Sequence, residues 1–318
     1  ATFSLEPYKV YPLIFCFSFA IFGICKARNL SDTFYLSFSF AFGWFCFGLY
    51  WISNAFLVKS GFYTFLMPIA VALLPLILSL IWCIAINTAK LISLKIGEVH
   101  FNVIITLSIF EYIRGELLNF PWLMPGSFFS SEEVLIQGFS FIGSYSMNVV
   151  FLIITILPIL IVKYKKISII PIILFLTPIL FLFIKSYDRY LNKPFITFNE
   201  SHLINVIQPN IKQKIKWINS LRFDHHQKLI DLSKRNQEDS HLLSILNIWP
   251  ETAFLGLYPR DKSLLQDLSK RFLNPKKNEF LFTGSIYKHQ DNYFNSALLI
   301  NSKAEIRNIY SKNVLVPF

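Results

Sequence analysis

The sequence predicts a polytopic α-helical membrane domain of six spans followed by a mixed α/β domain. Hydrophobic residues make up 54% of the 318 residues and charged residues only 15%, whereas a soluble domain carries about 25% charged residues. The apolar excess ends near Ile184, and from Asn199 onward charged residues recur as in an ordinary globular protein. The two regions therefore face different solvents, with a transmembrane helical domain at 1–190 and a globular domain at 199–318.

Six apolar segments approach the length of about 20 residues that a helix needs to cross the hydrocarbon core of a bilayer. The fifth is longer than a crossing needs, so its first turns are expected along the membrane interface. The fourth is the least apolar, because Glu111, Arg114 and Glu116 lie inside it or at its end. The segments are residues 11–27, 33–58, 64–87, 102–118, 134–162 and 167–185.

The charges of the loops indicate the orientation of these spans. Lys and Arg concentrate in alternate loops, and such basic loops stay in the cytoplasm. The basic loops carry Lys26, Arg28, Lys90, Lys95, Lys163, Lys165 and Lys166, whereas the opposite loops carry Lys9, Lys59, Glu132 and Glu133. Six spans return the chain to its starting side. Residues 199–318 are therefore expected outside the cytoplasm, which in a bacterium is the periplasmic face of the inner membrane.

The fourth span contains ionisable residues that need either a partner or a function. Intramembrane charges mark functional sites by default, because burying an unpaired charge is costly. Glu111 and Arg114 are three residues apart on one helix face, however, so they can neutralise each other. We favour this structural pairing, at the end of a helix that emerges near Phe120, Pro121 and Trp122 close to the outer interface.

Charge and cysteine content exclude several classes of function. The net charge is +11, but the basic residues are scattered and form no run interleaved with aromatics, which argues against nucleic-acid binding. The cysteines all lie in the apolar region, where cysteine usually packs as a small apolar side chain. The globular region therefore has no disulfide framework and no zinc-site spacing, and we expect no metal. The cysteines are Cys16, Cys25, Cys46 and Cys83.

The globular region has the pattern of an α/β domain. Short apolar strands alternate with polar helices, in the order β-α-β-α-β-β. Asp261 is expected to cap the second helix, and a polar turn at 289–292 is expected to join the last two strands as a hairpin. The strands are expected at 203–207, 242–248, 280–287 and 295–301, and the helices at 220–236 and 261–272.

Two charged residues follow predicted strands, where the catalytic residues of a layered α/β domain gather. Glu251 follows Trp249 and Pro250, and a carboxylate beside a large apolar ring can have a raised pKa and act as a general base. A helix-capping or solvated glutamate is the alternative for a lone Glu. Lys312 follows another strand and, taken alone, would be a surface lysine. Trp217, taken alone, would be a core or interface aromatic.

Together these residues belong to a series of motifs. The segment 208–217 reads QPNIKQKIKW, 249–253 reads WPETA and 310–318 reads YSKNVLVPF. Thr283-Gly284 is followed by YFNSAL at 293–298, and the apolar region contains GLYWI at 48–52, EYIRG at 111–115 and FPWL at 120–123. In their order along the chain the motifs resemble those of the apolipoprotein N-acyltransferases, the membrane branch of the nitrilase superfamily, over nearly the whole chain.

The resemblance implies a fold and a role for several residues. It implies a nitrilase-like αββα sandwich, also called the carbon-nitrogen hydrolase domain, with a Glu-Lys-Cys triad. In this triad Glu251 would be the general base and Lys312 the oxyanion and orientation group. Trp217, Trp249 and Asn295 would contact the substrate. The resemblance implies no cofactor.

The resemblance also implies a reaction and its partners. In this family a cysteine thiolate takes the sn-1 acyl chain of a phospholipid as a thioester. The acyl chain then passes to the N-terminal amine of an S-diacylglyceryl-cysteine apolipoprotein. Such an enzyme is expected to act as a monomer in the bacterial inner membrane. A non-catalytic remnant that binds lipid or lipoprotein is one alternative. A transporter is another, but the sequence lacks the paired halves with helix breaks that a transporter would show.

Some features of the family are missing from the sequence. Asn313-Val314 stands where the family has a residue followed by His, and no cysteine follows Cys83. Residues 3–8 resemble the loop after the family's first span. Phe318 precedes the positions of the family's second glutamate, its nucleophile and its last span. We therefore expect a chain truncated at both ends, with an incomplete nitrilase-like domain that is inactive alone.

Overall fold

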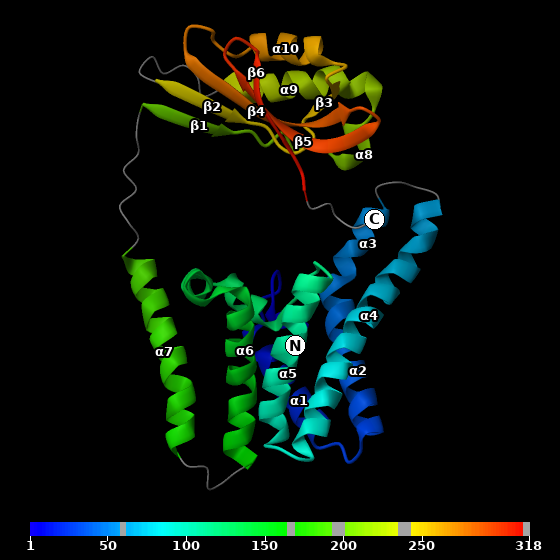
Figure 1. Cartoon of the computed structure of the whole chain (residues 1–318), viewed down its shortest axis with the longest axis vertical. Helices are drawn as coiled ribbons and strands as arrows, with labels where there is room; N and C mark the ends of the chain where they lie inside the picture. The colour runs from blue at the N-terminus through cyan, green and yellow to red at the C-terminus, as the bar shows by residue number, and fades with distance from the viewer. Residues whose placement is uncertain (58–61, 164–168, 193–200, 235–242, 314–318) are drawn as a thin grey trace. The chain divides into compact units, whose positions relative to one another are not determined.

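The chain forms two compact units, Ala1–Pro194 and Phe195–Phe318. The computed structural model describes residues 1–57, 62–163, 169–192, 201–234 and 243–313. Within these residues the first unit is helical, whereas the second combines helices with a β-sheet (Figure 1). The expected change from a helical to an α/β region is therefore confirmed.

The first unit is a bundle of long helices (Figure 1). Helix α4 packs against α2 and α5, while α1 contacts α2 and α6. Prolines lie inside α4, α6 and α7, where each removes one backbone hydrogen bond. The helices are α1 (Phe15–Cys25), α2 (Leu30–Leu49), α3 (Ser53–Phe56), α4 (Phe62–Ser93), α5 (Val99–Leu117), α6 (Phe139–Lys163) and α7 (Ile169–Leu191).

Three helical stretches of the described chain are long and apolar enough to cross a membrane, Leu30–Phe56, Thr64–Ser93 and Leu135–Ile161. They coincide with the second, third and fifth predicted spans. The first predicted span forms a shorter apolar helix, Tyr11–Cys25. The fourth forms α5, whose last two turns contain Glu111, Arg114 and Glu116. The sixth was predicted to begin at Ile167, outside the described residues, and α7 lies at that place.

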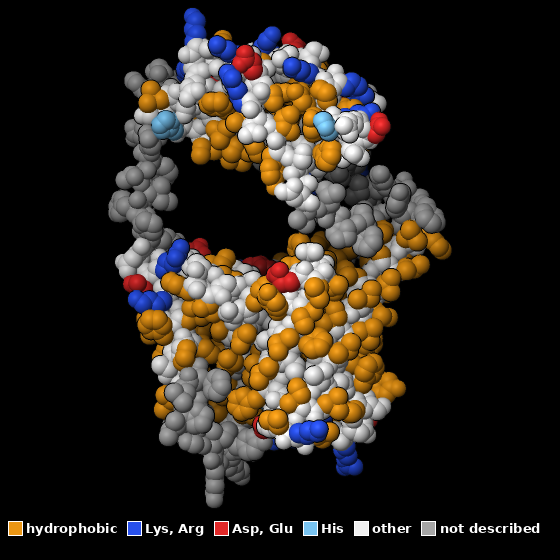
Figure 2. Space-filling view, viewed as in Figure 1, with side chains coloured by type: hydrophobic (Ala, Val, Ile, Leu, Met, Phe, Trp, Pro, Cys, Tyr) orange, Lys and Arg blue, Asp and Glu red, His pale blue; other side chains and the backbone are white. Residues whose placement is uncertain are grey.

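The outer surface of the first unit suits a hydrocarbon solvent. Large apolar side chains remain exposed along its sides (Figure 2), including Phe19 and Phe65, which are 73% and 75% exposed. Its interior is aromatic, because Phe17 packs edge-on against Trp44, Trp82 and Phe151 with ring centroids 5.2–6.0 Å apart. Apolar side chains therefore line both the inside and the outside of the bundle, as expected for a membrane protein.

Glu111 and Arg114 form a buried ion pair, as the sequence predicted. The Arg114 guanidinium donates to both carboxylate oxygens of Glu111, at 2.9 and 2.5 Å, and both side chains are at most 1% exposed. The Trp82 indole N–H also donates to Glu111, at 2.6 Å. Arg114 further donates to the backbone carbonyls of Phe120 and Trp122, at 2.7 and 2.9 Å. The pair therefore fixes the chain that follows α5.

Replacing Arg114 alone should strongly destabilise the first unit. Arg114→Met leaves the Glu111 carboxylate buried without its cation, and breaking a buried pair in this way costs about 3–5 kcal/mol. The double variant Glu111→Gln/Arg114→Met buries no charge and should be more stable than Arg114→Met. Thermal unfolding of the detergent-solubilised chain measures both. The exposed Arg28→Met is the control, and an equally small effect of Arg114→Met and Arg28→Met would contradict the structural role.

The second unit contains one mixed β-sheet in its described residues. The strand order is β1-β2-β4-β5-β6, and β3 pairs with the second half of β4. Strands β1 to β4 are parallel to one another, whereas β4, β5 and β6 are antiparallel. The strands are β1 (His202–Val206), β2 (Ser244–Ile248), β3 (Phe254–Tyr258), β4 (Asn278–His289), β5 (Asn292–Asn301) and β6 (Ile306–Ser311).

The strands and helices that were predicted for this unit are present in its described residues, together with elements that were not predicted. Strand β3 was not predicted, because Gly256 interrupts its apolar pattern. Asp261 precedes α10 but makes no capping hydrogen bond; its carboxylate instead accepts the Leu257 N–H at 2.9 Å and an Arg222 N–H at 3.3 Å. The predicted hairpin is confirmed, since His289 pairs with Asn292 at the turn between β4 and β5.

Helices α9 (Arg222–Lys234) and α10 (Lys262–Lys270) pack on one face of the sheet, and a short helix α8 (Gln213–Lys216) precedes them (Figure 1). Leu229, Ile230, Leu265 and Leu268 of α9 and α10 form the core with residues of β4 and β5. On the opposite face apolar side chains are exposed; Ile204 and Val206 of β1 are 65% and 71% exposed. The described residues thus form one sheet with helices on one side.

Candidate active site

Three predicted site residues meet at one edge of the sheet in the second unit. Glu251 lies three residues after the end of β2, Asn295 lies on β5 and Lys312 directly follows β6. Pairing of β5 with β6 places Asn295 and Lys312 together, because the Lys312 N–H donates to the Asn295 carbonyl at 2.8 Å. They line a hollow of about 280 Å³. Its lining comprises Trp249, Glu251, Phe282, Gly284, Asn295, Ser296, Ala297, Tyr310 and Lys312.

The Glu251 carboxylate has two partners, and both bind the same oxygen. The Asn295 side-chain amide donates to Oε1, and the Lys312 ammonium donates to Oε1 at 3.3 Å. In the described part of the chain no hydrogen bond to Oε2 is found. The Glu251 side chain is 63% exposed and that of Lys312 38%. One oxygen thus orients the carboxylate, and the other remains available to accept a proton.

The pKa of Glu251 is lowered, contrary to the raised pKa that its neighbour Trp249 suggested. The Asn295 amide and then the Lys312 ammonium stabilise the ionised carboxylate, and together they outweigh the modest burial that would raise the pKa. Trp249 does not desolvate the carboxylate, because its ring faces the core and stacks on Phe272 at 5.4 Å. Glu251 is therefore ionised at neutral pH, the form that a general base needs.

The turn that carries Glu251 is held from two sides. Lys216 donates to the Glu251 backbone carbonyl at 3.2 Å and to the Thr252 hydroxyl at 2.7 Å. Thr252 has a positive φ of 48°, which such contacts help to maintain. On the other side Gly284 of β4 touches the turn, because a Cβ on Gly284 would lie 2.8 Å from the Glu251 Cα. A side chain at position 284 would therefore displace the turn.

The two tryptophans proposed to bind substrate lie in different surroundings. Trp249 lines the hollow but is only 2% exposed, and its indole N–H donates to the Ser233 hydroxyl at 2.9 Å. Trp217 is 52% exposed and is not part of the lining. It is linked to the site through Lys216, whose ammonium lies 5.6 Å from the Trp217 ring centroid.

Sequence reasoning did not assign a role to Lys216 or Gly284. Both belong to motifs that were recognised, one at 208–217 and the other at 283–284. Lys216 contacts residues that lie 35 and 36 positions further along the chain. A local sequence pattern does not predict contacts between segments so far apart. The described residues contain no cluster of three or more His, Cys, Asp or Glu that could hold a metal.

An added methyl group at Gly284 should disturb the Glu251 carboxylate. Gly284→Ala pushes the turn away from β4, and forcing atoms into a packed site costs about 1–3 kcal/mol. As Glu251 moves away from Asn295 and Lys312, its pKa should rise toward the ordinary value. NMR titration of carboxyl-labelled glutamates measures this change. Gly43→Ala is the control, because its Cβ would meet nothing within 4 Å. An unchanged Glu251 titration in Gly284→Ala would contradict the packing argument.

Known proteins are similar to this chain over both of its units. A family described as the apolipoprotein N-acyltransferase N-terminal domain matches residues 1–157. The chain is 27% identical to an apolipoprotein N-acyltransferase of Rhodopseudomonas palustris, covering 100% of this chain and 62% of that protein. It is 29% identical to one of Rickettsia prowazekii, covering 98% and 62%, and 25% identical to one of Agrobacterium fabrum, covering 91% and 55%. The chain thus spans less than two thirds of the length of these relatives.

Proposed function

This chain is a homologue of the apolipoprotein N-acyltransferases, and from that premise we propose that its second unit provides the base and the oxyanion group for N-acylation of lipoproteins. The observation that carries the proposal is the meeting of Glu251, Asn295 and Lys312 in one hollow at the strand ends. The acyl donor is a phospholipid, and the acceptor is the N-terminal amine of an S-diacylglyceryl-cysteine lipoprotein.

In the proposed mechanism Glu251 accepts the proton of a cysteine thiol through its Oε2. The thiolate attacks the sn-1 carbonyl carbon of the phospholipid and forms a thioester; the bond to the glycerol oxygen breaks, and this oxygen takes the proton from Glu251 as the lysophospholipid leaves. Lys312, which lies beside the carboxylate, stabilises the negative oxygen of the tetrahedral intermediate. The lipoprotein amine then attacks the thioester and restores the thiol. Asn295 and Trp249 shape the hollow that receives the reacting ester, and Trp217 contacts the lipid at the surface.

The loop charges and the candidate spans support an inner-membrane location with the second unit in the periplasm. Lys26 and Arg28 lie between α1 and α2, and Lys90 and Lys95 lie in the last turn of α4 and just after it, which argues for a cytoplasmic position of these connections. The proposed architecture is a polytopic helical domain at 1–190 and a nitrilase-like αββα domain at 199–318. The described sheet with helices on one face is compatible with one half of such a sandwich.

The proposed base can be tested in a complete enzyme, obtained by joining residues 1–318 to the nucleophile-bearing segment of a relative. Glu251→Gln removes the proton acceptor but keeps the shape of the side chain, so acyl-enzyme formation should slow by about 10²–10⁴-fold. Labelled phospholipid measures the rate. Glu305→Gln, in an ion pair with Arg307 on the same unit, is the control and should be normal. Normal acylation by Glu251→Gln would show that Glu251 is structural.

The distribution of cysteine favours a second candidate, that residues 1–318 alone bind lipid or lipoprotein without turnover. Cys16, Cys25, Cys46 and Cys83 all lie in helices of the first unit. Cys25 and Cys83 are buried. No residue from 84 to 318 supplies a thiol beside Glu251. A thioester mechanism at Glu251 therefore needs sulfur from outside these residues.

The 318 residues alone should consequently form no thioester. After incubation of the purified chain with acyl-labelled phospholipid in nanodiscs, we expect no hydroxylamine-sensitive label on the protein and no acylation of diacylated lipoprotein. The four-serine variant, in which all four cysteines are replaced, sets the background. A hydroxylamine-sensitive adduct above that background would refute the expectation and identify a membrane cysteine as the nucleophile.

A further inference from the structure

The first unit contains an apolar groove between α1 and α6 with a volume of about 220 Å³. One face of α1 supplies Phe15, Ser18, Phe19 and Phe22, and α6 supplies Pro158 and Ile159. Phe15 and Phe19 are 57% and 73% exposed, so the groove opens on the surface of the bundle. In a membrane-embedded unit such a surface faces lipid.

Two residues of the lining have little bulk or no backbone donor. Pro158 lies inside α6, where it removes one backbone hydrogen bond of the helix. Opposite it, Ser18 has a small side chain among three phenylalanines. Ser18 is 7% exposed, and its buried hydroxyl has no hydrogen-bond partner in the described part of the chain. Ser18 thus contributes a small side chain to the floor of the groove.

The size and shape of the groove fit a hydrocarbon chain. From Phe15 to Phe22 the helix rises about 10 Å, which gives a narrow channel along α1. An apolar cavity of about 150 Å³ already takes up benzene, so this larger space accommodates a longer apolar ligand. Methylene groups of a chain in the groove would pack closely against the phenylalanine rings, and the many atom contacts would add dispersion energy to binding.

Cations lie at one end of the groove. Lys26 follows α1 by one residue, and its ammonium sits 4.1 Å from the ring centroid of Phe22. A separate open hollow of about 420 Å³, at the same end of α1 but on its α2 side, is lined by Lys26, Arg28 and Tyr35, together with Asp32. Two cations outnumber the one carboxylate, so this end favours an anionic group.

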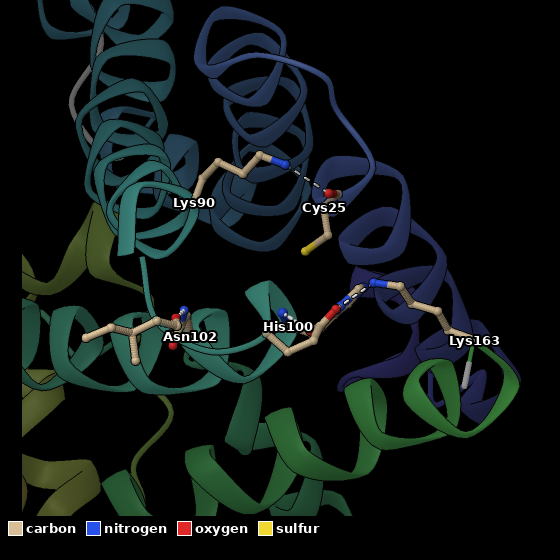
Figure 3. Close-up of polar contacts among 7 residues, drawn as sticks. Cys25, Lys90, His100, Asn102 and Lys163 are labelled. Atoms are coloured by element: carbon tan, nitrogen blue, oxygen red, sulfur yellow. Dashed lines mark hydrogen bonds and ion pairs between the residues drawn. The ribbon is translucent and has the colours of Figure 1, made fainter. Parts of the chain in front are cut away.

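Hydrogen bonds fix both walls of the groove at this end (Figure 3). Lys90 of α4 donates to the backbone carbonyls of Cys25 and Ala27, at 3.2 and 2.9 Å, and thereby holds the end of α1. Lys163, the last residue of α6, pairs with Glu98 at 2.6 Å, which holds α6 to the start of α5. A groove with fixed walls loses little conformational entropy when a ligand enters.

We propose that this groove binds one acyl chain of an anionic phospholipid, whose phosphate lies at Lys26 and Arg28. The lipid is retained as a bound molecule and is not consumed. The site belongs to the first unit, whereas Glu251 and Lys312 belong to the second. The inference therefore does not depend on the proposed acyl transfer.

The test uses the full 318-residue chain in nanodiscs that contain either phosphatidylglycerol or phosphatidylcholine with a photoreactive group on one acyl chain. After irradiation, peptide mapping should place the phosphatidylglycerol label on α1 and on α6 near Pro158. Ser18→Leu fills the groove and should reduce this label to background. Lys26→Gln removes one phosphate contact and should reduce it about fivefold. Because Lys26 is exposed, this variant remains informative if Ser18→Leu does not fold.

Two matched controls accompany these variants. Cys16→Leu adds the same bulk at an exposed position of α1, and Lys95→Gln removes one exposed charge from another basic loop; both should leave the label unchanged. Equal labelling by phosphatidylcholine, an even spread over all exposed helices, or normal labelling of Ser18→Leu would each overturn the proposal. So would a cross-linked dimer through α1, because a second copy would then occupy the groove.

Discussion

Pairing of carboxylates with cations is the constraint on which the shape of both units depends. A charge withdrawn from water is tolerated only beside a partner, and the paired groups or their further hydrogen bonds hold neighbouring segments in place. Glu111 with Arg114 holds the chain after α5, and Glu98 with Lys163 joins the start of α5 to the end of α6. The exposed Glu251–Lys312 pair contributes less energy. Its contribution is geometric, since it orients one carboxylate oxygen.

The sequence was sufficient to predict the helices of the first unit but not all of the contacts between them. Long apolar runs predict helices because their side chains satisfy a hydrocarbon solvent, and α2, α4 and α6 followed this rule. The i,i+3 spacing also predicted the Glu111–Arg114 pair. The contact of Glu111 with Trp82 could not be predicted, because it joins two helices through tertiary packing.

In the second unit the motifs pointed to three residues that lie together in one hollow, but not to what surrounds them. Glu251, Asn295 and Lys312 met as the motif pattern implied. The predicted direction of the Glu251 pKa shift was wrong. Trp249, its neighbour in sequence, packs in the core, whereas Asn295 and Lys312, its neighbours in space, stabilise the ionised carboxylate. Strand β3 and the approach of Gly284 to the turn depend on register between strands. That register is irregular, because it shifts between Phe254 and Leu257 of β3.

The shared oxygen of Glu251 links the two steps of the proposed chemistry. While Glu251 is ionised, Lys312 and Asn295 both donate to Oε1, and the ammonium is partly neutralised by the carboxylate. Transfer of a thiol proton to Oε2 removes the negative charge, and the charge-assisted bond from Lys312 weakens accordingly. The ammonium then becomes available to the oxyanion that forms in the same step. In the proposed mechanism, proton acceptance by Glu251 would thus release the cation when the reacting ester needs it, a role that a second neutral donor could not fill.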